Sequence, residues 1–213
     1  TIPTLQANNM QIGLSTDYKI FLYQQGGDLF ADDGMRINLD SDIALKAFDK
    51  MCNLFTMYSF PYSYSAANRF RSGEMPIILG DYVGTYNQMK IYATEIEGKW
   101  TFVPLPGERD EDGNINNVAI STVMSTVMVK GCDNEARAWS FMQWYTGADC
   151  QVDFANEMVA IMGNSAKQAV ANRHALASLP WTTEEYREIQ AQFNNLGAVP
   201  NYPGSYIIGR YTG

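Results

Sequence analysis

The sequence is poor in the residues from which metal centres and many active sites are built. Its 213 residues include one histidine and three cysteines, and these form no CxxC or Cys/His pair that would indicate zinc. A Ser/His/Asp triad would have to use His174, and no Gly-x-Ser-x-Gly elbow is present. The sequence also lacks a GxGxxG motif and a P-loop. We therefore expect no metal and no nucleotide cofactor.

Positive charge and long apolar runs are scarce as well. Lys and Arg number 15 against 23 Asp and Glu, which gives a net charge of −8 with no basic cluster. A nucleic acid or an anionic membrane surface would be repelled, so neither is an expected partner. Apolar runs are far shorter than the ~20 residues that span a bilayer. The chain begins without Met and shows no signal peptide, and we interpret it as a piece of a longer protein.

Apolar residues make up 46% of the chain, which is enough for a packed core. Helical periodicity and β-rich stretches alternate along the chain, and this alternation predicts the α/β class. Asp40 or Ser41 is expected to cap a helix, and Thr182 with Glu185 to form a capping box. The first predicted helix includes Tyr18 to Tyr23 and runs to a stop at Gly26-Gly27; the others cover 41–55, 68–72, 82–92, 133–145, 152–158, 165–179 and 182–196. The predicted strands cover 75–79, 99–104 and 118–130, with a hairpin at 28–39 and a charged loop at 108–117.

The most informative stretch runs from residue 69 to residue 82. It combines a short helix ending in Phe-x-x-Gly, an apolar strand, and a Gly-Asp-Tyr turn at the carboxyl end of that strand. Ligands of open α/β sheets bind outside the carboxyl ends of strands. Tyr82 is therefore a candidate platform for stacking a ligand, or else an ordinary cleft-lining core ring. Asp81 is a candidate acceptor for ligand hydroxyls, or else a turn-forming Asx residue.

Four sequence motifs follow one another along the chain: Gln-Gly-Gly-Asp-Leu-Phe at 25–30, Phe-Arg-Ser-Gly-Glu-Met at 70–75, Trp-Thr-Phe-Val-Pro-Leu-Pro-Gly at 100–107 and Ala-Arg-Ala-Trp-Ser-Phe-Met at 136–142. In this order they resemble the extracellular solute-binding proteins of family 1, the maltose-binding-protein-like sugar receptors of ABC importers. Four such motifs in the right order are hard to obtain by chance.

The resemblance covers nearly the whole chain and implies a type II periplasmic-binding-protein-like fold. In this α/β fold, two lobes close on a ligand. The resemblance places residues 1–117 in the carboxyl-terminal lobe and residues 118–163 in a segment that crosses into the amino-terminal lobe. Residues 164–213 would return to the carboxyl-terminal lobe, truncated at its end. By the same resemblance, the first part of the amino-terminal lobe is absent from this sequence.

The resemblance also suggests which residues touch a ligand. Tyr82 falls where relatives often carry a stacking Trp or Tyr. Tyr18 lies near a second aromatic position of the family, and Tyr206, after a Pro-Gly turn, lies near a third. Ser121 and Thr122, at the crossing between lobes, would supply hydroxyls. Together with the aspartate before Tyr82, these residues form the expected ligand-binding set.

The function implied by the resemblance is capture of a sugar or oligosaccharide outside the cell and its delivery to the transmembrane subunits of an ABC permease. We expect a monomer with no cofactor and no enzymatic activity. Its attachment to the membrane would be only through a lipid anchor lying outside this piece. The location would be the surface of a Gram-positive cell, as a lipoprotein, or the periplasm.

Two other classes of protein stay open. An α/β carbohydrate-active enzyme would need a pair of carboxyl groups in its cleft, and such a pair is set by distance in space rather than by spacing along the sequence. An extracellular sugar-sensing or adhesion module would bind sugar without a permease. A peptide or another polar solute in place of sugar would be a smaller variation on the receptor.

Overall fold

The computed structural model describes residues 2–14, 17–31, 36–110, 112–121 and 125–198, apart from the side chains of Tyr82 and Ala198. The chain divides into two compact units. The first unit comprises Thr1–Tyr64, Val103–Thr122 and Gln190–Gly213, and the second comprises Ser65–Phe102 and Val123–Ile189.

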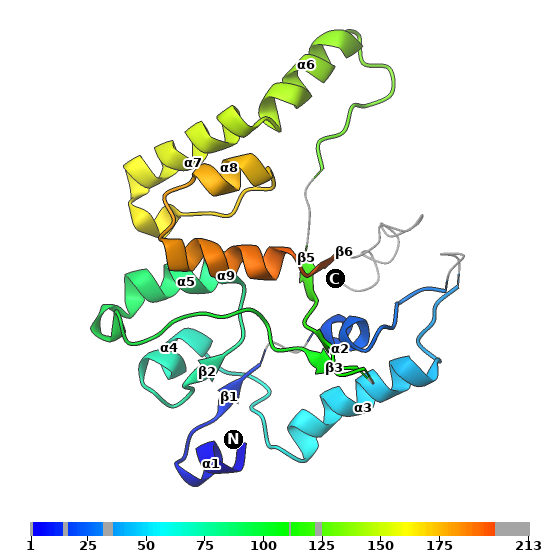
Figure 1. Cartoon of the computed structure of the whole chain (residues 1–213), viewed down its shortest axis with the longest axis vertical. Helices are drawn as coiled ribbons and strands as arrows, with labels where there is room; N and C mark the ends of the chain where they lie inside the picture. Colours follow the sequence, from blue (N-terminus) through cyan, green and yellow to red (C-terminus); the bar gives the residue numbers. More distant parts are fainter. Residues whose placement is uncertain (1, 15–16, 32–35, 111, 122–124, 199–213) are drawn as a thin grey trace. The chain divides into compact units, whose positions relative to one another are not determined.

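Short strands and three helices make up the described part of the first unit (Figure 1). Their bounds are Ile2–Ala7 (α1), Ile12–Gly13 (β1), Tyr18–Gln24 (α2), Asp42–Thr56 (α3), Glu108–Arg109 (β3), Ile115–Asn116 (β4), Ala119–Ser121 (β5) and Leu196–Ala198 (β6). Strands β3 and β4 form an antiparallel hairpin. Strands β5 and β6 pair in parallel, with Ala119 opposite Leu196.

The core of the first unit lies where α2 packs on α3. Leu22 is fully buried there, together with Ala44 and Ala47. The two alanines have small side chains, so the helices can approach each other closely. Asp17 caps the start of α2 and Ser41 caps the start of α3, each by accepting a backbone N–H from the first turn.

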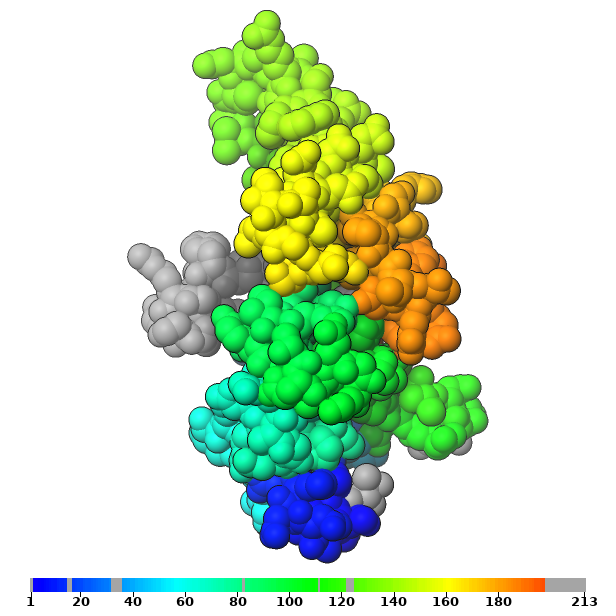
Figure 2. Space-filling view, turned by 90° about the vertical axis from the view of Figure 1, so that its left-hand side faces the viewer, coloured from blue at the N-terminus to red at the C-terminus, as the bar shows by residue number. Residues whose placement is uncertain are grey.

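The second unit is mainly helical in its described part (Figure 1). Its elements are Ala66–Arg71 (α4), Ile77–Ile78 (β2), Tyr82–Tyr92 (α5), Thr94–Ile96 (η1), Glu135–Tyr145 (α6), Ala148–Met162 (α7), Asn164–Ala166 (η2), Arg173–Ser178 (α8) and Thr183–Phe193 (α9), of which α9 ends in the first unit. Helices α7 and α8 pack side by side, as the yellow and orange segments of Figure 2 show. Its described buried hydrophobic side chains are Met75, Tyr86, Met89, Ala93, Ala155, Ala175, Leu176, Leu179 and Ile189.

Several predictions that rest on local signals are confirmed. Helix α5 covers residues 82–92 as predicted. Thr182 and Glu185 form the predicted capping box, because the backbone N–H of each bonds to the side chain of the other, at 2.8 and 3.2 Å. Phe30 and Ile37 form an antiparallel bridge where a hairpin was expected, although its Asp-Gly turn lies outside the described residues.

Three predicted elements are wrong, at least in part. The stretch 99–104 is irregular, because its aromatic rings pack on α5 and Pro104 has no N–H to offer a strand. Within the described residues of 118–130, only β5 is a strand. The expected helix at 165–179 is replaced by η2, an irregular stretch and α8. The side chain of Asn172 starts α8 by accepting two backbone N–H groups.

Two further details differ from expectation. The charged loop at 108–117 is the β3–β4 hairpin, whose turn includes Gly113 at a φ of +86°, a conformation that favours glycine. On α3 the buried residues are alanines, whereas Leu45 and Phe48, expected on the buried face, are about half exposed. No helix in the described part of the chain has the length and apolar character needed to cross a membrane.

Candidate functional site

The turn between β2 and α5 carries two of the predicted ligand-binding residues. Asp81 is the N-cap of α5, and its exposed carboxylate accepts the backbone N–H of Gly84. A Cβ at Gly84 would lie 2.7 Å from an oxygen of Asp81, so glycine allows this close cap. Tyr82 is the first residue of α5. Asp81 therefore has a structural role in the backbone of this turn, which agrees with the alternative of a turn-forming Asx residue. Its contact with a ligand stays a prediction.

Within the second unit, a cluster of aromatic rings packs against α5. The Tyr86 ring meets Trp100 with centroids 5.8 Å apart and Phe102 with centroids 5.9 Å apart, both edge to face. Phe70, on α4, meets Trp100 in the same way at 6.1 Å. This arrangement is favourable for aromatic quadrupoles. It joins the predicted Phe-x-x-Gly helix to the helix that begins at Tyr82.

The carboxylate of Glu185 has three polar partners. One oxygen accepts a hydrogen bond from the Tyr86 hydroxyl. The other accepts the backbone N–H of Thr182 at 2.8 Å and lies 3.5 Å from Nζ of Lys167. These contacts connect α5, the segment after η2 and the start of α9, and they satisfy a side chain that is only 8% exposed.

The electrostatics of this group are set by its partners. Burial alone would raise the pKa of the Glu185 carboxyl, but the hydrogen bonds from Tyr86 and Thr182 and the charge of Lys167 outweigh burial and hold that pKa below its usual range. Burial and then the Glu185 carboxylate raise the pKa of the Tyr86 hydroxyl. At neutral pH, an ionised glutamate therefore accepts a hydrogen bond from a neutral tyrosine.

A small hollow lies beside this network. It is lined by Ala155, Val159, Lys167, Gln168, Leu179, Pro180 and Trp181. The ammonium group of Lys167 lies 5.7 Å from the centroid of the Trp181 ring, a cation–π distance. The space inside the hollow is about 10 Å³, roughly the room for one water molecule. This is far below the roughly 300–1,000 Å³ of typical small-molecule pockets, so we do not assign a sugar to it.

Tyr18 and Ser121 lie in the first unit. The Tyr18 hydroxyl donates to the carbonyl oxygen of Ala44 at 2.8 Å, and its ring meets Phe48 edge to face at 6.2 Å. Burial raises the pKa of the Tyr18 hydroxyl. Ser121 is the last residue of β5, opposite Ala198 of β6. Both residues have structural contacts, and their contact with a ligand stays a prediction.

The predicted set is thus divided by the architecture. Tyr18 and Ser121 belong to the first unit, and Asp81 and Tyr82 to the second. The side chain of Tyr82 lies outside the described residues, as do Thr122 and Tyr206. The structure brings Asp81 and Tyr82 into one turn and describes no side-chain contact between the other predicted residues.

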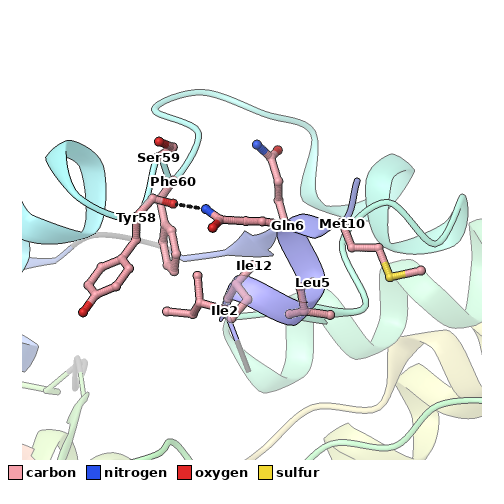
Figure 3. A pocket seen from close by; sticks show the side chains of 9 residues that line it. Ile2, Leu5, Gln6, Met10, Ile12, Tyr58, Ser59 and Phe60 are labelled. Atoms are coloured by element: carbon pink, nitrogen blue, oxygen red, sulfur yellow. Dashed lines mark hydrogen bonds between the residues drawn. The ribbon is translucent and has the colours of Figure 1, made fainter. Parts of the chain in front are cut away.

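A second hollow lies in the first unit, between α1 and the stretch from Tyr58 to Phe60. Figure 3 shows apolar side chains, among them Ile2 and Ile12, gathered below Phe60, with Gln6 donating to the carbonyl oxygen of Tyr58 at 2.7 Å. The space inside this hollow is about 10 Å³, so, like the first one, it is far smaller than a typical ligand pocket. The residues that line it are those through which α1 packs against the stretch from Tyr58 to Phe60, and we assign no function to the hollow.

Sequence reasoning missed several residues that support α2 and α5, the helices that carry the predicted residues Tyr18 and Tyr82. The Asn116 side chain donates to the carbonyls of Tyr23 and Gln24, both at 3.0 Å, and so ends α2. Lys167 and Glu185 meet although they are 18 residues apart. The capping-box pattern predicts the local role of Glu185, but no signal in the sequence predicts its burial or its bond to Tyr86, 99 residues away.

Comparison with known families now identifies the class of this protein. The family model described as bacterial extracellular solute-binding protein matches residues 4–201. The chain therefore belongs to this family, as its motifs indicated. A search of curated protein sequences gave no significant match.

Three solved structures resemble the chain. One is an ABC transporter solute-binding protein from Thermotoga lettingae bound with α-D-tagatose, at 19% sequence identity and a TM-score of 0.58. Another is the maltose-maltodextrin binding protein of Alicyclobacillus acidocaldarius, at 18% identity and a TM-score of 0.60. The third is an ABC substrate-binding protein from Listeria monocytogenes in complex with cycloalternan, at 12% identity and a TM-score of 0.55. They match 95%, 97% and 97% of this chain, which covers 52%, 56% and 52% of theirs. The α/β, periplasmic-binding-protein-like fold class is thereby confirmed, and the chain spans about half the length of these proteins.

Proposed function

We propose that this chain is part of a receptor that binds a sugar or oligosaccharide and delivers it to an ABC permease. The observation that carries the proposal is the match of 95–97% of the chain to three binding proteins: one bound with α-D-tagatose, a maltose-maltodextrin binding protein, and one in complex with cycloalternan. Membership of the extracellular solute-binding family supports the same function. The receptor would bind and release its solute without chemical change or cofactor.

The proposed binding surface is centred on the turn at the start of α5. Tyr82 would stack on the apolar face of a sugar ring, and Asp81 would accept from sugar hydroxyls with its second oxygen. The cap that Asp81 forms with Gly84 supports this, because it fixes the backbone of the turn. Tyr18, Ser121, Thr122 and Tyr206 complete the proposed set.

We also propose the lobe assignment that the motifs suggest, with residues 1–117 and 164–213 in the carboxyl-terminal lobe and residues 118–163 in the amino-terminal lobe. Three ring-bearing residues of α6, which we call the α6 aromatic face, support the second part. Phe141 contacts both Trp144 and Tyr145, yet all three are 53–61% exposed. Exposed aromatic patches of this kind mark surfaces that pack against another part or partner. The half of the structural relatives that this chain does not cover supplies such a part.

The proposed location is outside the cytoplasmic membrane, either on the cell surface as a lipoprotein or in the periplasm. Family membership supports an extracellular site. The proposed partners are a sugar and the transmembrane subunits of the permease. The receptor itself is proposed to be a monomer.

The test is a thermal-shift screen on the full-length protein, with maltose, maltotriose, D-tagatose, cycloalternan, amino acids and short peptides. A rise in melting temperature that grows with the concentration of one sugar, without a product, is the expected result. Cleavage of a glycoside would indicate the enzyme instead. A rise in melting temperature with peptides alone would make the solute a peptide instead of a sugar. No rise with any compound would contradict the proposal.

A pair of variants tests the binding surface. We expect Tyr82→Ala to weaken sugar binding by about 1–3 kcal/mol, the burial scale of an aromatic side chain. Tyr92→Ala is the matched control, because Tyr92 is an exposed tyrosine at the other end of the same helix. Equal affinities of the two variants by calorimetry would remove Tyr82 from the site.

A further inference from the structure

Glu185 is the one charged side chain that is buried among the residues the structure describes. Its neighbours leave neither carboxylate oxygen without a partner: Tyr86 and Thr182 donate to it, and Lys167 lies within ion-pair distance. Replacing buried ion pairs by apolar residues often leaves stability unchanged or raises it. A gain in stability alone is therefore a weak reason for this arrangement, and a geometric role explains it better.

The network holds α5 at two successive residues. The Tyr86 hydroxyl bonds to the Glu185 carboxylate, and the side-chain amide of Asn87 donates to the carbonyl of Lys167 at 2.9 Å. Because Lys167 also pairs with Glu185, both anchors of α5 lead to the same group. Toward the far end of the helix, Met89 is buried and Lys90 pairs with Glu97 at 2.9 Å, while Ile91 and Tyr92 are at least half exposed.

Position 82 lies one helical turn before position 86. At 3.6 residues per turn, residues four apart share one face of a helix, so the direction in which position 82 projects follows the rotation of α5 about its axis. The Asp81 cap fixes where the helix begins. The anchors at Tyr86 and Asn87 fix how the helix is turned.

We infer that Glu185, acting through Tyr86, is a positioning residue for the ligand-binding turn at Asp81 and Tyr82. This inference rests on the proposed sugar-binding function. The carboxylate does not touch the ligand. It orients α5 so that the stacking position faces the sugar, and it thereby sets the affinity of the receptor.

A double-mutant cycle on the full-length protein tests the inference. Tyr86→Phe keeps the ring packing but removes the hydroxyl that bonds Glu185. It is combined with Tyr82→Ala, and calorimetry measures the Kd for whichever of maltose, D-tagatose or cycloalternan the unsubstituted protein binds. Tyr92→Phe is the control, because it removes a hydroxyl from the exposed end of the same helix. Tyr82→Leu replaces the alanine variant if the latter binds too weakly to titrate.

We expect Tyr86→Phe alone to raise Kd about three- to tenfold, the equivalent of one orienting hydrogen bond. On the Tyr82→Ala background the same change should alter Kd by less than about twofold, because the residue through which it acts is gone. A Tyr86→Phe effect of the same size on both backgrounds would overturn the inference, and so would no effect on either.

Two further results complete the test. If Tyr86→Phe does not fold, Glu185→Gln takes its place in the cycle, because it keeps the shape of the side chain and removes its charge. The same coupling to Tyr82 is expected, and its absence counts against the inference. Failure of the unsubstituted protein to bind any of the three sugars would contradict the proposed function itself, which is a different result from sugar binding without coupling.

Discussion

At Glu185 a single carboxylate receives a hydroxyl, a backbone N–H and an ammonium group. Without such partners, a buried carboxylate would cost several kcal/mol in lost hydration. The Thr182 N–H is local to the start of α9, but Tyr86 and Lys167 come from α5 and from the segment after η2, so all three meet the carboxylate only when the second unit is folded. The charged form of Glu185 is therefore stabilised only in the folded unit, and its protonation should lower the free energy of unfolding.

The pH dependence of stability follows from the lowered pKa of Glu185. In the unfolded chain this carboxyl titrates near its ordinary pKa of about 4.5, which lies above its pKa in the folded protein. The unfolded state therefore binds more protons in this range, and the stabilisation is present above about pH 4.5 and lost as pH falls through the folded pKa. We expect the urea midpoint of the full-length protein to fall more steeply, as pH drops below about 4.5, than that of Glu185→Gln. Parallel pH profiles of the two proteins would contradict this.

Tyr18 offers a second prediction at a single residue. Its hydroxyl joins α2 to α3 through the carbonyl of Ala44, so Tyr18→Phe should lower the free energy of unfolding by about 0.5–1.5 kcal/mol, the net value of one hydrogen bond. Tyr62→Phe is the control, because Tyr62 is 93% exposed. Urea denaturation of the two variants measures the difference. If Tyr18→Phe behaves like the control, the hydroxyl does not hold the two helices together.

At the scale of elements, sequence reasoning succeeds where the signals are local. The helix predicted at 82–92 is α5, and the capping-box pattern predicts the start of α9. The stretch 99–104 has an apolar pattern typical of a strand, yet its rings are used to cover α5 instead of pairing in a sheet. The irregular conformation of this stretch depends on packing against Tyr86, which lies more than ten residues before it in the sequence.

The candidate site divides in the same way. The turn at Asp81 and Tyr82 was found from the sequence because its parts are adjacent, and its cap is observed. The support behind it was not found, because the contacts of Tyr86, Lys167 and Glu185 span up to 99 residues and no periodic pattern records them. Tertiary packing, rather than local propensity, decides these contacts.

The contact between α4 and the aromatic cluster gives a prediction at this scale. Phe70 is half buried against Trp100, so Phe70→Ala should lower the free energy of unfolding by about 1–3 kcal/mol through lost apolar burial. Tyr62→Ala, which removes an exposed ring, should stay within about 0.5 kcal/mol of the unsubstituted protein. Chemical denaturation compares the two. Equal small effects would place Phe70 outside the packing of α5.

At the scale of the whole molecule, the chain corresponds to about half of its structural relatives. A surface that is exposed here therefore need not be exposed in the full-length protein. Helix α6 is the element to which this applies most strongly, because no residue along it is buried and its aromatic face is continuous. The proposed lobe assignment places this face against the remainder of the protein.

Substitution of Trp144 separates the two situations by magnitude. Trp144 is 61% exposed in this chain, so if it stays on the surface Trp144→Ala should change the free energy of unfolding by no more than about 0.5 kcal/mol. If the rest of the protein covers the α6 aromatic face, the same substitution creates a cavity and should cost about 3–5 kcal/mol. We expect the larger value in urea denaturation of the full-length protein, with Tyr92→Ala as a control of similar exposure that remains within about 0.5 kcal/mol. A small effect at both positions would show that α6 keeps its exposed face, and residues 118–163 would then have to be reassigned from the amino-terminal lobe.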